Sequence, residues 1–157
     1  MKKIILGILI IFISSPLFAQ FSLDKFWNIE LGHSISSVKK LFPNEKWEER
    51  EAGNDNLYTF YGWIEPSSIK VSFLFTKSDQ LRAKIISNGK IDIDSATTLF
   101  KQLKELLIKK FGTKYEKKDT IGKSILIWRV GKDGAVTLSN EGDKTSMINL
   151  EAVGISF

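Results

Sequence analysis

The chain has 157 residues, no cysteine, one histidine and a formal net charge of +5 at pH 7. The lack of cysteine excludes disulfide crosslinks and cysteine nucleophiles. A chain of this length buries about two thirds of the surface that it exposes when unfolded, so a hydrophobic core alone can stabilise it. The lysines and arginines are scattered and form no dense basic stripe, so we expect no nucleic-acid partner.

The first twenty residues have the pattern of a secretory signal peptide. Two lysines precede an apolar run over residues 4–13, which the stretch from Ser14 to Pro16 ends. A membrane-spanning helix needs ~20 apolar residues, and this run is shorter. We therefore predict a leader over residues 1–19, no transmembrane segment after its cleavage, and an exported protein that is periplasmic or extracellular.

A short helix is predicted just after the only histidine. Ser34 can cap its first turn, apolar residues then recur at helical spacing, and Pro43 ends it. His33 therefore precedes a helix cap. Catalysis of the Ser-His-Asp kind also needs a group that orients the imidazole, so we predict no catalytic role for His33.

Three strands are predicted next. They cover residues 57–64, 69–75 and 81–86, where apolar and aromatic residues alternate with polar ones. The intervening loops, 65–68 and 76–80, are short and polar. Neighbouring strands should therefore pair antiparallel and form a meander.

The second half repeats this order. Asp94 is the predicted cap of a long helix over residues 95–111, and Gly112 is its predicted stop. Three more strands should follow, near residues 124–130, 135–139 and 145–157.

We therefore predict an α+β fold. Two tandem units, 20–88 and 89–157, would each hold a helix and then a three-stranded antiparallel meander, and together they would form one compact unit. Phe42 and Phe111 each end a predicted helix, and each is followed by a glycine twenty residues later. Duplication of one unit and two unrelated units are both compatible with this pattern.

Carboxylates are the remaining groups for acid-base chemistry. Glu48, Glu49 and Glu51 lie together in a polar stretch, and Asp92 and Asp94 have the D-x-D spacing of calcium sites. The rest of a calcium-binding loop is missing, and helix capping explains Asp94. We expect no metal and no cofactor, and a carboxylate-dependent secreted hydrolase is the enzymatic alternative.

Aromatic and basic side chains mark the predicted binding surface. Alternation in the first predicted strand directs Tyr61 and Trp63 away from the core, and alternation in the third directs Arg82 and Lys84 the same way. Exposed rings among cations are typical of recognition surfaces. The alternative is that the second unit, or its helix, covers this face and buries the rings.

The pattern F-W-x-I-x-L-G-x-S-x-x-x-V-x-x-L-F over residues 26–42 resembles the start of certain small bacterial periplasmic domains. They are those of the BamE (SmpA/OmlA) type and of the beta-lactamase-inhibitor-protein type, in which two such units occur in tandem. The matching positions are Leu31, Gly32, Ser34, Val38 and Leu41. The resemblance implies a non-enzymatic scaffold that works by contact. The lipid-attachment cysteine typical of BamE proteins is absent, and no functional residue is carried over.

The expected function follows from these observations. We predict an exported, non-enzymatic binding or adaptor module of the bacterial cell envelope, whose partner is a protein or another envelope component. An inhibitor of a secreted enzyme is a further alternative.

Overall fold

The structure, a computed structural model, describes residues 21–131, 134–142 and 145–153. The predicted leader lies outside the described residues, as do the last four residues of the predicted strand 145–157. The helices are α1 (Leu23–Trp27), α2 (Ile35–Leu41) and α3 (Ile93–Phe111). The strands are β1 (Glu48–Ala52), β2 (Asp55–Ile64), β3 (Ser67–Thr76), β4 (Leu81–Ser87), β5 (Ile91–Asp92), β6 (Glu116–Thr120), β7 (Lys123–Val130), β8 (Gly134–Glu141) and β9 (Thr145–Val153).

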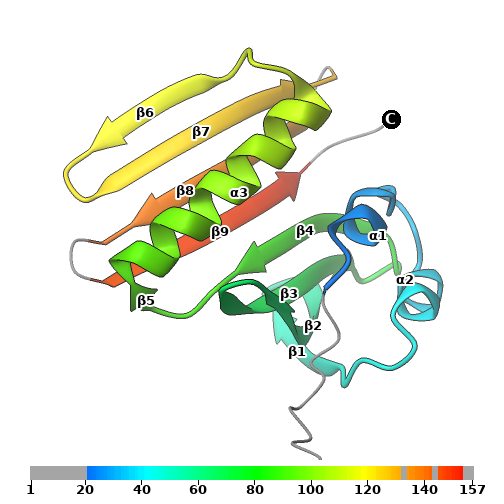
Figure 1. Ribbon diagram of the computed structural model, residues 1–157. Helices are drawn as coiled ribbons and strands as arrows, with labels where there is room; N and C mark the ends of the chain where they lie inside the picture. Colours follow the sequence, from blue (N-terminus) through cyan, green and yellow to red (C-terminus); the bar gives the residue numbers. More distant parts are fainter. Residues whose placement is uncertain (1–20, 132–133, 143–144, 154–157) are drawn as a thin grey trace, which may run out of the picture.

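Eight of these strands form one continuous antiparallel sheet in the order β1-β2-β3-β4-β9-β8-β7-β6, and the short β5 pairs with one end of β9 (Figure 1). The join is the antiparallel pairing of β4 with β9, in which Ala83 lies opposite Val153 and Ser87 opposite Asn149. The α+β class is correct. The prediction of two tandem helix-then-three-strand units is wrong, because each half contributes four strands to a single shared sheet.

Besides the two-residue β5, the strands that the sequence did not predict are the two edges of this sheet. Every residue of β1 (EEREA) and of β6 (EKKDT) is exposed. Charged residues on an edge strand discourage pairing with another chain. These segments show no alternation of apolar and polar residues, because neither face of an edge strand here is buried.

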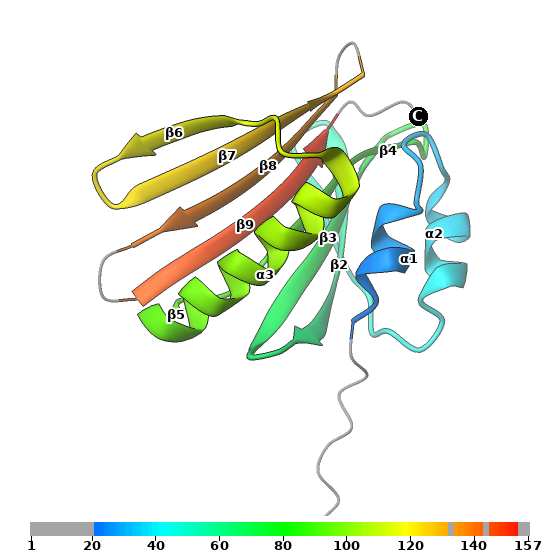
Figure 2. The same cartoon turned by 45° about the horizontal axis from the view of Figure 1, so that its top comes forward.

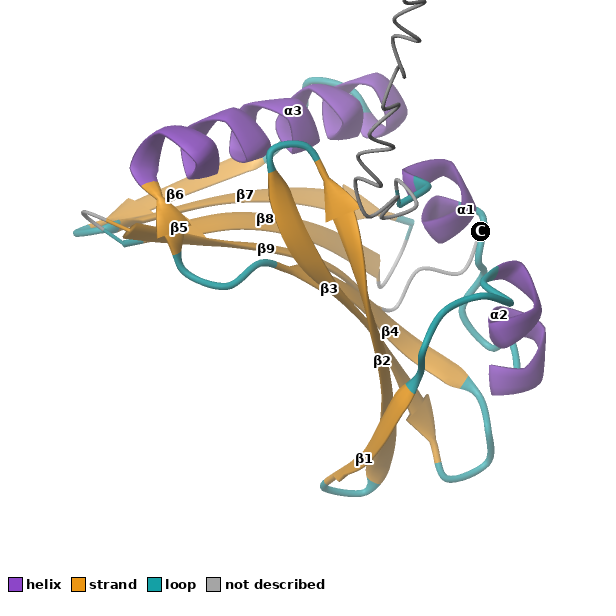
Figure 3. Ribbon diagram, turned by 60° about the horizontal axis from the view of Figure 1, so that its bottom comes forward, coloured by secondary structure: helices purple, strands orange, loops and turns teal. Residues whose placement is uncertain are grey.

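The three helices lie on one face of the sheet (Figure 2). α3 packs across β8 and β9, and α1 and α2 cover the half formed by β2 to β4. The sheet bends between its halves, and the helices lie on the outside of that bend (Figure 3). In the described part of the chain no helix covers the opposite face, which we call the open face.

Aromatic rings fill the space between the first half of the sheet and its helices. Phe60 and Phe73 are fully buried, and the ring of Phe42 lies 5.1 Å from that of Phe60 and 6.1 Å from that of Phe73. Such ring pairs add specific contacts to the hydrophobic effect. Gly62 makes room for this cluster, because a Cβ atom there would lie 3.1 Å from the Cβ of Phe21.

The helix ends are set by local capping. The hydroxyl of Ser34 accepts a hydrogen bond from the N-H of Ser37, as predicted. The predicted cap of α3 was wrong by two residues. Asp92, and not Asp94, accepts from the N-H of Ser95 at 2.9 Å.

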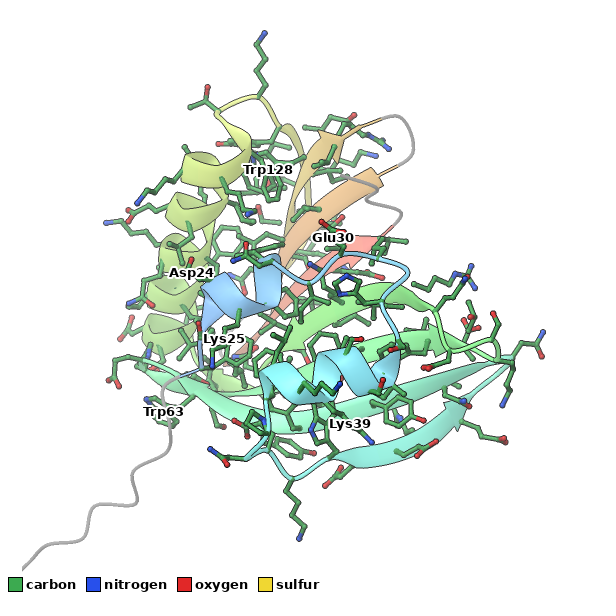
Figure 4. The ribbon with its side chains drawn as sticks, turned by 90° about the vertical axis from the view of Figure 1, so that its right-hand side faces the viewer. Asp24, Lys25, Glu30, Lys39, Trp63 and Trp128 are labelled. Carbon is green, nitrogen blue, oxygen red and sulfur yellow. The ribbon has the colours of Figure 1, made fainter. Side chains whose placement is uncertain are left out.

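The second half of the core is built around Trp128. Its side chain is buried between α3 and the sheet (Figure 4), and its indole N-H donates to the carbonyl of Gly112 at 2.9 Å. The glycine has a φ of 85°, a conformation that suits glycine at the predicted end of α3. One hydrogen bond thus ties the end of α3 to β7.

A β-bulge in β4 reverses the predicted faces of the residues that follow it. Leu81 lies opposite Phe75, but the next residue of β3 lies opposite Ala83, so Arg82 is an extra residue. A bulge of this kind shifts the alternation by one position. We predicted Ile85 in the core and Lys84 outside. In the structure Lys84 is buried in the core and Ile85 lies partly exposed on the open face, whereas Ala83 is buried although it lies on the same face as Ile85.

Candidate functional site

The open face extends across eight strands of the bent sheet. One row of side chains crosses it without interruption, because the registers of all seven strand pairings align. The row consists of Glu48, Thr59, Ser72, Ile85, Glu151, Thr137, Ile127 and Glu116. Its centre lies where β4 meets β9, so neither half of the chain could form this surface alone.

Tyr61 and Trp63 lie on the open face, as predicted. Tyr61 is 57% exposed, and Lys70 is its neighbour on β3. Trp63 is half-buried, and its indole N-H donates to the carboxylate of Glu65 at 3.0 Å. The alternative in which the second unit covers this face is wrong. The strands of that unit continue the sheet beyond β4 instead, and the Tyr61 ring stays exposed.

Arg82 is exposed on the bulge, at the other end of the same half. Its guanidinium donates to the carboxylate of Asp55 at 3.1 Å. Tyr61 is in register with Lys70, and Arg82 lies near Leu74, about 13 Å further along β3 at ~3.3 Å per residue. Arg82 therefore forms no cluster with the two aromatic residues.

Lys84 is not on the open face at all. It is 2% exposed, and its ammonium group donates to the backbone carbonyls of Phe26 at 3.0 Å, Trp27 at 3.4 Å and Ile29 at 2.8 Å. Burial, and to a lesser extent the charge of Lys110, lowers its pKa to about 8. This lysine connects the sheet to the end of α1 and cannot reach a partner in this conformation.

Several open-face residues were not part of the predicted site. Ile85, Ile127, Thr137 and Glu151 come from four different strands. The pairings of β7, β8 and β9 align the last three, and the pairing of β4 with β9 adds Ile85 to the same row. The alternation in the last predicted strand does place Glu151 on a face with Asn149. What the sequence did not show is which strand lies beside it.

The five carboxylates of the hydrolase alternative do not converge. Glu48, Glu49, Glu51, Asp92 and Asp94 are all exposed, the first three on the edge strand β1 and the other two around the start of α3. Glu49 accepts from the hydroxyl of Tyr58 at 2.7 Å. Acid-base catalysis by a carboxylate pair needs both groups at one walled site, which these five do not provide.

The backbone of His33 takes part in a contact that stabilises the fold. Its backbone carbonyl accepts from the N-H of Leu81 at 2.9 Å, and its imidazole lies 4.0 Å from the carboxylate of Glu30. The residue before it, Gly32, donates to the carbonyl of Leu81 at 2.8 Å. This two-way pairing joins the segment before α2 to the start of β4.

A separate groove of about 520 Å³ lies between α3 and the end of the β2-β3 hairpin. Its apolar lining is formed by Phe21, Leu23, Ile64 and Leu106. The groove is open, and a single lysine, Lys109, stands among its polar residues. It therefore has no arrangement of groups that indicates a particular chemistry.

Among the residues that the structure describes, no cluster of three or more histidine, aspartate or glutamate side chains could hold a metal ion. Within the same residues, none of the helices is long and apolar enough to cross a membrane. Comparisons with protein-family models, with curated proteins and with solved structures found no match. The residues of the chain itself are thus the basis for a functional proposal.

Proposed function

We propose that this protein is an exported, non-enzymatic binding or adaptor module of the bacterial cell envelope, and that it binds a folded protein partner through the open face. The observation that carries the proposal is the row of side chains that crosses all eight strands on a face without helices. Eight strands at a spacing of ~4.8 Å give a surface ~34 Å wide. That width suits one side of a standard protein interface, which buries about 800 Å² per partner.

The composition of this face supports contact with a protein. Tyr61 offers a large, rigid and mostly exposed ring at one end, and Ile85 and Ile127 are partly exposed further along. Aromatic and aliphatic side chains of this kind provide the central contacts of protein interfaces. Thr137, which lies between Ile85 and Ile127 in the row, adds a partly exposed hydroxyl group.

Two features of the sequence also support the proposal. The pattern of residues 1–19 is that of a secretory leader, which favours export. The resemblance of residues 26–42 to BamE-type and inhibitor-type domains favours a protein that acts by contact. The identity of the partner would distinguish an adaptor from an inhibitor of a secreted enzyme.

A photo-crosslinking experiment tests the proposal. A photoreactive amino acid replaces Tyr61 on the open face or, as the matched control, Leu106, which is 42% exposed on α3. We expect a discrete crosslinked protein in envelope extract from the first position only. That protein is then identified by mass spectrometry and purified for measurements of Kd.

The purified partner gives the decisive result. We expect Tyr61→Ala with Trp63→Ala to weaken binding at least tenfold, which corresponds to about 1.4 kcal/mol, because large aromatic side chains contribute strongly to protein interfaces. Leu106→Ala should leave Kd within twofold. Full affinity of the double variant, with an unchanged circular dichroism spectrum, would overturn the proposal.

A further inference from the structure

The centre of the open face holds one carboxylate in neutral surroundings. Glu151 of β9 is exposed, and its cross-strand neighbours are Ile85 on β4 and Thr137 on β8. The other six positions around it on this face are likewise small or uncharged. They are Ala83, Ser87, Asn149, Val153, Ala135 and Ser139.

Glu151 differs in this respect from three other carboxylates of the same face. Glu48, at the edge of the row, has no ion pair either among the described side chains, but Arg50 lies two residues further along the same face of β1. Asp55, Glu116 and Glu141 each have a cationic neighbour, at 3.1 Å, 3.3 Å and 2.9 Å. No such ion pair involves Glu151 among the side chains that the structure describes. No described side chain therefore balances its negative charge.

Solvent can no longer balance this charge once a partner covers the face. Removing an ionised carboxylate from water costs several kcal/mol unless an opposite charge and hydrogen bonds replace the water. A partner with a neutral or acidic group above Glu151 would therefore be strongly disfavoured. The carboxylate selects for a cation at this point of the interface.

We infer that Glu151 is the recognition point for a cationic side chain of the protein partner, an arginine in preference to a lysine. This inference rests on the proposed use of the open face for binding. The small residues around Glu151 leave room for a long side chain to approach, and Ile85 and Val153 offer apolar contact to its aliphatic stem. A guanidinium donates two parallel hydrogen bonds to a carboxylate, which an ammonium cannot do.

The probe for this site is N-acetylarginine methylamide, with the citrulline analogue as a neutral control of the same shape. Each is titrated into ¹⁵N-labelled protein, and the amide signals of Ile85, Thr137 and Glu151 are followed by NMR. We expect the arginine compound to shift these signals with an apparent Kd about 1.4- to 5-fold lower than that of the citrulline compound. Exposed ion pairs of about 0.2–1 kcal/mol produce effects of this size.

Two variants complete the experiment. Glu151→Gln should abolish the preference for arginine, whereas Glu48→Gln, at the edge of the same row, should retain it. Equal shifts by the two compounds, or a preference that survives Glu151→Gln, would overturn the inference. The crosslinking result from position 61 is independent of this outcome. If the titration shows no preference for arginine, the proposed function still stands. If crosslinking fails, the selectivity of the Glu151 site can still be measured by titration.

Discussion

The ammonium nitrogen of Lys84 lies 2.8 Å from the backbone carbonyl oxygen of Ile29, fifty-five residues earlier in the chain. It also donates to the carbonyls of Phe26 and Trp27 and lies 5.2 Å from the ring centroid of Phe26. One buried cation thus satisfies carbonyl groups at the end of α1 and holds that helix against β4. A charge in such a place predicts measurable effects on stability.

Replacing Lys84 with methionine should destabilise the protein. Methionine fills similar space but leaves buried carbonyl oxygens without a donor, and each such loss costs about 1–3 kcal/mol. We expect the free energy of unfolding in urea, followed by tryptophan fluorescence, to fall by at least that amount. Lys118→Met, an exposed change on the edge strand β6, is the control and should stay within about 0.5 kcal/mol. Equal stability of the two variants would show that the Lys84 contacts contribute nothing.

The same lysine should make stability depend on pH. Burial lowers the pKa of Lys84 from 10.5 to about 8 in the native protein. Between these values the unfolded chain holds a proton that the native chain has lost, so the free energy of unfolding rises with pH. We expect the difference between native protein and Lys84→Met to increase from about pH 8 to pH 10.5. A flat or falling difference would mean that Lys84 is charged in the native state throughout.

The start of α3 predicts a contrast between two aspartates. Asp92 accepts from the N-H of Ser95, which lowers the pKa of its carboxyl group, while Asp94 lies within the helix and is exposed. Loss of a capping side chain lowers stability, so Asp92→Ala should reduce Tm by about 2–6 °C. Asp94→Ala should change Tm by about 1 °C at most.

The contribution of Asp92 to stability should be present above the ordinary carboxyl pKa and disappear as pH falls, because protonation removes the charge of the acceptor. Calorimetry at neutral and acidic pH measures both effects.

The hydrogen bond between Tyr58 and Glu49 predicts a late phenol titration. Donation to the Glu49 carboxylate, together with burial, raises the pKa of Tyr58 from 10.0 to about 12. Ultraviolet absorbance of the phenolate should therefore show one tyrosine that ionises near pH 12 and shifts to lower pH in Glu49→Gln. Glu48→Gln, next to it on β1, should leave this step in place. The stability that Tyr58 contributes is present below about pH 10 and is lost toward pH 12, because the native state then holds the extra proton.

Local patterns in the sequence predicted the elements whose stabilising contacts are near in the chain. The Ser34 cap and helical spacing located α2, and the predicted stop at Gly112 located the end of α3. Alternation located β2, β3, β7 and β8 to within a few residues. It also placed Tyr61 correctly on the face away from the helices. These features depend on residues two to four positions apart, which a sequence displays directly.

Three features of the fold depend on contacts between residues that are far apart in the sequence. The bulge at Arg82 arises in the pairing of β4 with β3, and it moved Lys84 from the expected surface into the core. The charged edge strands β1 and β6 have no apolar pattern and are strands only because β2 and β7 offer them backbone partners. The short α1 is held by the carbonyl contacts of Lys84.

The long-range contact with the largest effect on the fold is the pairing of β4 with β9. The sequence by itself determined the α+β class, the helices α2 and α3 and most of the central strands, and it offered few groups for proton transfer. Only the tertiary structure decided that the halves join into one sheet and that Glu151 comes to lie beside Ile85. Hydrogen bonds between backbones carry no residue code, so the order of strands in a sheet is chosen by the packing of the whole chain.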